Sequence, residues 1–154
     1  MAKTNSEFPL LEEFRHRTNV EVRFADMDSF GHVNNAAFLT FIEQARIKYF
    51  DDISGWHYDV SKEGVILAHA SVDFIRPLDF KEVLIVLTRC TKIGSKSITL
   101  VHRMVTKTSD GREEETAAAE SIVVAFNYAA MKSIPVPQKW REAIGRFEGK
   151  MFSV

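Results

Sequence analysis

Hydrophobic and polar residues alternate over Thr18–Ala25, with Val20, Val22 and Phe24 on the apolar face. This period of two predicts a half-buried β-strand. From Asn35 onward the apolar residues instead recur every three or four positions, which predicts an amphipathic helix. The apolar stripe of that helix consists of Phe38, Phe41, Ile42, Ala45 and Tyr49.

Polar residues and a glycine mark both ends of the predicted helix. Asn34 or Asn35 is expected to cap its start, because an asparagine side chain accepts a hydrogen bond from an N–H of the first turn. Asp51 and Asp52 are followed by Gly55, which is typical of a helix end because glycine adopts the left-handed conformation.

Four further apolar or β-branched runs read as strands and are joined by short polar turns. They are Val65–Ile75, Val83–Cys90, Ser97–Thr106 and Glu120–Asn127. Lys92–Ser95 reads as a turn, and Ser109–Arg112 reads as the tip of a hairpin. After Pro135 and Pro137, the pattern over Gln138–Phe147 predicts a short closing helix.

The order of these elements favours one architecture. Short connections favour an antiparallel meander, and such a sheet must bury one face against the only long apolar helix in the sequence. We therefore expect an α+β fold, with a curved antiparallel sheet of about five or six strands wrapped around one long central helix. A single domain covers residues 1–154, with a core over about residues 18–128 and a C-terminal extension over about residues 129–154.

Composition supports one globular domain and narrows the function classes. Hydrophobic residues make up 45% of the 154 residues and charged residues 27%, and the net charge of -1 gives no reason to expect nucleic acid or an anionic membrane as partner. The lone cysteine, Cys90, excludes an internal disulfide and reads as a buried structural thiol in a reducing compartment. Residues 1–17 do not resemble a signal peptide, and no stretch is apolar enough to cross a bilayer, so a cytoplasmic location is expected.

The link between the first strand and the long helix carries the most chemistry. Asp28 is the leading catalytic candidate, because a carboxylate placed there can activate water or attack an acyl carbon held at the helix start. An Asx-turn is the ordinary alternative for such an aspartate. His32 can donate to a carbonyl or leaving group, and Gly31 permits a tight turn and close approach to a ligand.

The free N–H groups at the start of the long helix complement this acid. They carry partial positive charge and can hold an oxyanion, which suits acyl transfer. Asn35 caps the helix in the simplest interpretation, although its amide can also orient water or a carbonyl. Glu43 is an alternative base, but more often such a residue pairs with a cation, here Arg46 or Lys48.

Other motifs are absent or less specific. The sequence has no metal-ligand spacing, no G-x-S-x-G, no P-loop and no dinucleotide fingerprint. Five residues could hold the phosphates of a carrier such as coenzyme A, although a solvated basic surface explains them equally well. They are Arg76, Lys92, Gly94, Ser95 and Lys96.

The segment Asp26–Asn35, followed by Phe38, Glu43, Ala45 and Arg46, resembles the hot-dog-fold acyl-CoA thioesterases. The most similar type is the group of 4-hydroxybenzoyl-CoA and acyl-CoA thioesterases. The resemblance continues through Asp73–Leu78, Lys92–Ser97 and Ile134–Pro137, and it spans roughly residues 18–145.

The resemblance implies a role for several of these residues. Asp28 takes the place of the catalytic aspartate, and His32 that of the imidazole in the plant-type enzymes. The backbone N–H groups of Asn34, Asn35 and Ala36 would polarise the thioester carbonyl. It also implies dimers or pairs of dimers, with active sites at the subunit boundaries.

We therefore expect hydrolysis of an acyl-CoA thioester to a carboxylic acid and coenzyme A, without a metal or other cofactor. Asp28, His32 and Asn35 form the predicted catalytic set, and Phe30, Gly31 and Phe38 shape the acyl or aryl pocket. An enoyl-CoA hydratase on the same fold is the first alternative. A non-catalytic module that binds acyl-CoA or fatty acid is the second.

Overall fold

The computed structural model describes residues 9–57 and 59–153. Within them the elements are the short 3-10 turns η2 (Leu11–Glu13) and η3 (Phe24–Asp26), the helices α1 (Asn35–Ser54) and α2 (Gln138–Glu148), and the strands β1 (His16–Val20), β2 (Glu63–Phe74), β3 (Leu84–Ile93), β4 (Ser97–Lys107), β5 (Glu113–Asn127) and β6 (Lys132–Ser133).

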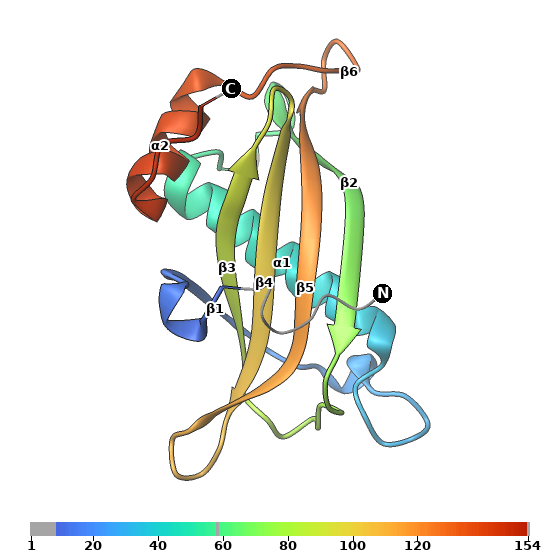
Figure 1. The fold of residues 1–154 in the computed structure, drawn as a ribbon. Coiled ribbons are helices and arrows are strands. Elements are labelled where there is room, and N and C mark those ends of the chain that lie inside the picture. Colours follow the sequence, from blue (N-terminus) through green and yellow to red (C-terminus); the bar gives the residue numbers. More distant parts are fainter. Residues whose placement is uncertain (1–8, 58, 154) are drawn as a thin grey trace.

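The strands form one antiparallel sheet in the order β1-β3-β4-β5-β2, and β6 adds a short pairing to β5. Helix α1 crosses one face of this sheet, as Figure 1 shows. This arrangement confirms the predicted hot-dog architecture. The expectation of a simple meander is wrong in one respect, because β2 pairs with β5 along its length and does not neighbour β3.

Helix α1 has the ends and the buried face that its sequence predicts. The Asn34 side chain caps its start, and Gly55 ends it with a φ of 67°. All five residues of the predicted stripe are buried. Ala117 and Ala119 on β5 belong to the same apolar cluster as Phe38 and Phe41, so their small side chains leave room for the helix aromatics.

Two strand boundaries differ from the prediction. The first strand covers His16–Val20 rather than Thr18–Ala25, because its partner β3 begins at Leu84 and Val20 is the last residue that it pairs. The chain then turns through η3, where Phe24 is exposed. Strand β5 begins at Glu113 instead of Glu120 and pairs with β4 from its first residue.

The C-terminal extension packs against the second half of α1. Helix α2 follows its prediction closely, and Trp140 and Ile144 join the cluster that contains Tyr49. Cys90 is buried in the same cluster, and burial raises the pKa of its thiol to about 12, consistent with a structural role. No helix in the described residues has the length and apolar character needed to span a bilayer.

Candidate active site

The segment between η3 and α1 folds into a tight hairpin. Met27 and Val33 form an isolated antiparallel bridge, and the Asp28 N–H donates to the His32 carbonyl at 2.9 Å. The Gly31 N–H closes the turn on the Asp28 carbonyl at 3.2 Å. Gly31 has a φ of 81°, a conformation that favours glycine. The hairpin therefore fixes Asp28 beside His32 in space.

Contacts on both sides anchor this hairpin. The Val33 N–H donates to the Leu78 carbonyl at 2.9 Å, and the Asn34 N–H donates to the Asp26 carbonyl at 2.8 Å. The buried Asp26 carboxylate accepts from the Arg23 backbone and guanidinium, both at 2.8 Å. These hydrogen bonds from Arg23 hold the pKa of Asp26 below its usual range. Asp26 is thus a structural carboxylate, distinct from Asp28.

A cavity of about 360 Å³ lies beside the hairpin and the start of α1. Six predicted site residues line it: Asp28, Phe30, His32, Asn35, Phe38 and Arg76. The rest of its wall consists of Val33 and the other residues of the segment 74–78, which follows β2. The sequence did not single out Phe74, Ile75, Pro77 and Leu78 as pocket residues, because only the fold brings them next to the hairpin.

The Asp28 carboxylate serves the turn and remains available to a ligand. Its Oδ1 accepts the Phe30 N–H at 2.9 Å, so the Asx-turn interpretation is confirmed. Its Oδ2 accepts no hydrogen bond within the described part of the chain. One oxygen therefore orients the side chain, while the other faces no protein donor.

The start of α1 offers fewer free N–H groups than predicted. The Asn34 N–H already donates to Asp26, and the Ala36 N–H donates to the Asn34 Oδ1 at 2.9 Å. Over residues 9–57 and 59–153 the Asn35 N–H has no acceptor. Of the three predicted oxyanion donors, Asn35 is the one that is unoccupied, at the positive end of the helix dipole.

Two other predicted residues lie away from the cavity wall. Gly31 shapes the turn and is not a lining residue. Glu43 is exposed on α1 and also outside the lining. Burial lowers the pKa of Arg46, and the charge of Glu43 opposes this, as expected for a carboxylate beside that cation.

The five residues considered for phosphate binding do not form one cluster. Arg76 lines the cavity, but its guanidinium donates to Glu82 at 2.8 Å and also to Thr106, and Glu82 raises its pKa. The other four lie at the opposite end of α1, where Lys92 is near the end of β3 and Gly94, Ser95 and Lys96 form the β3–β4 turn. The predicted turn over Lys92–Ser95 therefore begins two residues later, because Lys92 still pairs with Thr99 on β4. Helix α1 has 20 residues and is about 30 Å long. One copy of the chain therefore does not bring this turn to Asp28.

The site contains no evident metal centre. No group of three or more His, Cys, Asp or Glu side chains among the described residues is arranged to hold a metal ion. The chemistry available at the cavity is a carboxylate, an imidazole and a helix N-terminal N–H against an apolar wall.

Proteins of known sequence show similarity over most of this chain. The long-chain acyl-CoA thioesterase FadM of Escherichia coli is 21% identical over 83% of this chain and 96% of its own length. The uncharacterised protein YsmA of Bacillus subtilis is 30% identical over 56% of this chain. That match spans only 58% of YsmA.

Solved structures agree with the fold. A thioesterase from Thermus thermophilus, in complex with coenzyme A and Zn, is 33% identical with a TM-score of 0.77, over 91% of this chain and 98% of that one. A variant of 4-hydroxybenzoyl-CoA thioesterase bound to 4-hydroxybenzoyl-CoA has a TM-score of 0.75 at 18% identity, over 83% of this chain and 96% of that one.

The sequence signature of the thioesterase-like superfamily matches residues 22–144, which is the greater part of the chain. It includes the hairpin, α1 and all the main strands that follow α1. The chain therefore belongs to the thioesterase-like superfamily.

Proposed function

We propose that the protein hydrolyses acyl-CoA thioesters to a carboxylic acid and coenzyme A. The observation that carries this proposal is the convergence of Asp28, His32 and Asn35 on one apolar cavity. The similarity to FadM and to the coenzyme A complex from Thermus thermophilus supports coenzyme A as the carrier. The reaction needs no cofactor, since coenzyme A is part of the substrate.

We assign the roles of Asp28, His32 and Asn35 from their places on the cavity wall. The free Oδ2 of Asp28 deprotonates a water molecule or itself attacks the acyl carbon. As the tetrahedral intermediate forms, its oxyanion accepts a hydrogen bond from the unoccupied Asn35 N–H. The C–S bond then breaks, and His32 donates a hydrogen bond to the departing thiolate. On the water route the proton held by Asp28 passes to the thiolate; on the nucleophilic route water hydrolyses the acyl-Asp28 anhydride and restores the carboxylate.

The acyl or aryl group occupies the apolar part of the cavity. Phe38 is buried there, and its ring contacts Phe74 edge-to-face with centroids 5.2 Å apart. Phe30 is 84% exposed at the hairpin and can close over a bound ligand. This wall favours an apolar acyl or aromatic group over a charged one.

We further propose that the active unit is a homodimer joined along β2. Among the described residues this strand pairs only with β5, so it forms an edge of the sheet, and it exposes Ile66, Leu67 and Phe74. A long apolar edge strand favours pairing with a second copy. Antiparallel pairing of two β2 strands reverses the partner, so that its β3–β4 turn lies at the same end as Asp28. Lys92 near the end of β3 and Lys96 in the turn then serve the phosphates of a coenzyme A bound in the neighbouring copy.

Thiol release from a panel of short-chain, long-chain and aromatic acyl-CoAs tests the reaction, with crotonyl-CoA absorbance monitored in parallel. We expect free thiol from at least one substrate class and no hydration of crotonyl-CoA. Hydration without thiol release would contradict the proposal in favour of a hydratase. Tight acyl-CoA binding without turnover would contradict it in favour of a binding module.

Light scattering on wild type and Leu67→Lys tests the dimer, which the added charge should dissociate.

A further inference from the structure

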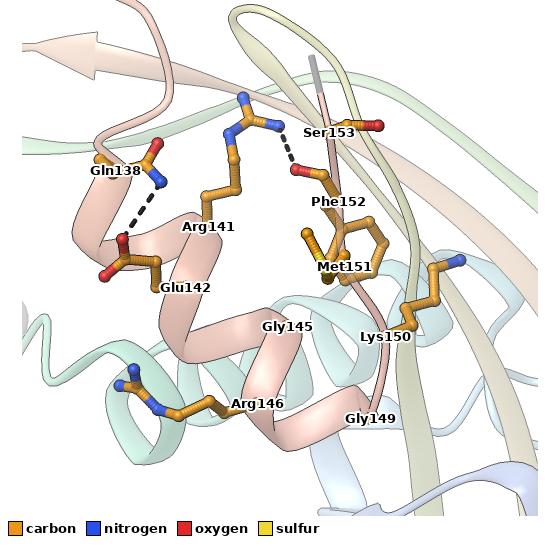
Figure 2. A pocket seen from close by; sticks show the side chains of 10 residues that line it. All are labelled: Gln138, Arg141, Glu142, Gly145, Arg146, Gly149, Lys150, Met151, Phe152 and Ser153. Atoms are coloured by element: carbon orange, nitrogen blue, oxygen red, sulfur yellow. Dashed lines mark hydrogen bonds between the residues drawn. The ribbon is translucent and has the colours of Figure 1, made fainter.

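A second groove lies far from Asp28, between α2 and the segment 149–153 that folds back beside it, as Figure 2 shows. Its volume is about 680 Å³, within the range of about 300–1,000 Å³ that small-molecule sites occupy. It lies at the end of α1 where Tyr49 packs near Trp140, the opposite end from the cavity.

The walls of this groove are held in place by the chain itself. Gly149 ends α2 with a φ of 69°, and the Lys150 N–H donates to the Gly145 carbonyl at 3.1 Å. A Cβ at Gly145 would lie 2.9 Å from the Lys150 carbonyl oxygen, so the segment passes this close only because position 145 is glycine. The groove is therefore formed before any ligand arrives.

Part of the groove surface is apolar and uncovered. Met151 is 93% exposed, and Phe152 is half-buried against the core beside it. At Gly145 the backbone of Lys150 closes directly on α2, so main-chain atoms form this part of the lining. The flexible and exposed Met151 side chain next to it adapts readily to an alkyl chain.

One buried cation in the wall has no carboxylate partner. Arg141 is 7% exposed, and its guanidinium donates only to backbone carbonyls: Gly94 at 2.7 Å, Phe152 at 3.3 Å and Ile93 at 3.4 Å. No acidic side chain in the described residues lies within 4.0 Å of it. The Arg141 charge is thus balanced by backbone carbonyls alone, and it adds positive potential to this wall of the groove.

The rim of the groove adds further positive charge. Arg146 is exposed and has no ion pair among the described residues. The Lys150 Nζ donates to the Thr91 carbonyl at 3.0 Å and lies 4.6 Å from the centroid of the Phe152 ring. Glu142 is the one carboxylate of the described lining, and it accepts from Gln138 at 3.2 Å. The lining of the groove thus includes three cationic side chains and one carboxylate.

We propose that this groove binds a free long-chain fatty acid, with its carboxylate at the exposed Arg146 on the rim and its chain along Met151 and Phe152. The charge excess selects an anionic head, and the apolar trough selects an alkyl chain. The site is separate from the cavity at Asp28, and its occupancy does not depend on the reaction proposed there.

Calorimetric titration with dodecanoate, below its micellar concentration, tests the proposal on the full chain. Met151→Asp places a carboxylate at an exposed groove position, and we expect it to weaken binding about tenfold or more. Arg146→Gln should weaken it roughly threefold, because the cation is exposed. Lys139→Gln is the matched control, since it removes an exposed cation from α2 outside the groove lining and should leave the affinity unchanged.

Three results would overturn the proposal. Dodecanol binding as tightly as dodecanoate would exclude recognition of the carboxylate. Wild-type affinity in Met151→Asp would place the ligand elsewhere, including the cavity at Asp28, which this variant leaves intact. A change in oligomeric state in Met151→Asp, without a change in dodecanoate affinity, would assign the groove to a contact between copies.

Discussion

The Asn34 side-chain Oδ1 accepts the N–H of Ala36 at 2.9 Å, and this bond decides which donor remains free at the start of α1. Because the Asn34 cap occupies the Ala36 N–H, the neighbouring Asn35 N–H is the donor left for a ligand. The Asn35 N–H has no acceptor in the part of the chain that the structure describes. The cap therefore stabilises the start of the helix and leaves Asn35 as the N–H that we propose holds the oxyanion.

Removing this cap should lower the free energy of unfolding. We expect Asn34→Ala to cost about 1 kcal/mol, because the Ala36 N–H loses its acceptor. Asn34→Asp keeps an acceptor at the same place and should change stability by only a few tenths of a kcal/mol, roughly. Urea denaturation measures both variants. Equal losses in the two would show that the cap bond is not the cause.

Gly31 and Gly111 form a matched pair for testing the hairpin. Their φ values are 81° and 83°, and an added Cβ would meet no atom within 4 Å at either position. Gly31→Ala and Gly111→Ala should therefore each lose about 1 kcal/mol of stability through backbone strain alone. Only Gly31→Ala should also reduce turnover, because its turn holds Asp28 and His32. A similar loss of turnover in Gly111→Ala would argue against a specific role for the hairpin.

The buried His102 should make stability depend on pH. Its ring lies between Thr88 at 3.1 Å and Ser121 at 2.8 Å, and burial, with a smaller effect from Arg46, lowers its pKa to about 3. The unfolded chain has a pKa near 6.5 at this residue, so it binds the extra proton between these values. Stability is therefore fully present above about pH 6.5 and falls towards pH 3, with about 2 kcal/mol lost by pH 5.

Denaturation curves from pH 7 to pH 5 measure this effect. His102→Gln should be less stable at neutral pH and should show a shallower decline with acid than the wild type. His57→Gln, at an exposed position just after α1, is the control and should keep the wild-type slope. An unchanged slope in His102→Gln would exclude His102 as the source.

The contact between Tyr49 and Glu148 fastens α2 to α1. The hydroxyl donates to the buried carboxylate at 2.6 Å, and the Cys90 N–H donates to the same oxygen at 2.9 Å. Tyr49→Phe should cost about 2 kcal/mol, because a charged acceptor loses a donor. Tyr128→Phe removes a bond to the neutral Val65 carbonyl and should cost about 1 kcal/mol. Chemical denaturation compares the two variants, and an unaffected Tyr49→Phe would contradict the assignment.

The sequence predicts the parts of the fold that are set by local periodicity. The caps of α1 and its stripe are determined within the helix, and they were predicted correctly. The start of β5 was not, because Glu113–Glu115 and Ala117–Ala119 have low intrinsic strand preference. Tertiary contacts override that preference there: Glu113 pairs with Arg17, and Glu115 pairs with Arg103 across the strands.

The candidate site could likewise be predicted only where its residues lie close together in the sequence. The hairpin residues are contiguous in sequence, so Asp28, His32 and Asn35 were found together. The wall over residues 74–78 comes from a distant segment, and only strand order brings it into place. The predicted phosphate-binding residues do not come together within one copy of the chain, because Arg76 and Lys92 lie at opposite ends of the sheet.

The central claim is that the Asp28 carboxylate performs the hydrolysis. The most direct measurement compares kcat/KM for thiol release in wild type and Asp28→Asn, using the acyl-CoA that the wild type cleaves fastest. Asparagine retains an acceptor for the Phe30 N–H, so the turn should persist. Asp110→Asn, in the exposed β4–β5 turn, is the control and should retain wild-type activity.

We expect kcat/KM of Asp28→Asn to fall by about 10²–10⁴-fold in a folded protein. A folded Asp28→Asn with near wild-type kcat/KM would contradict the account.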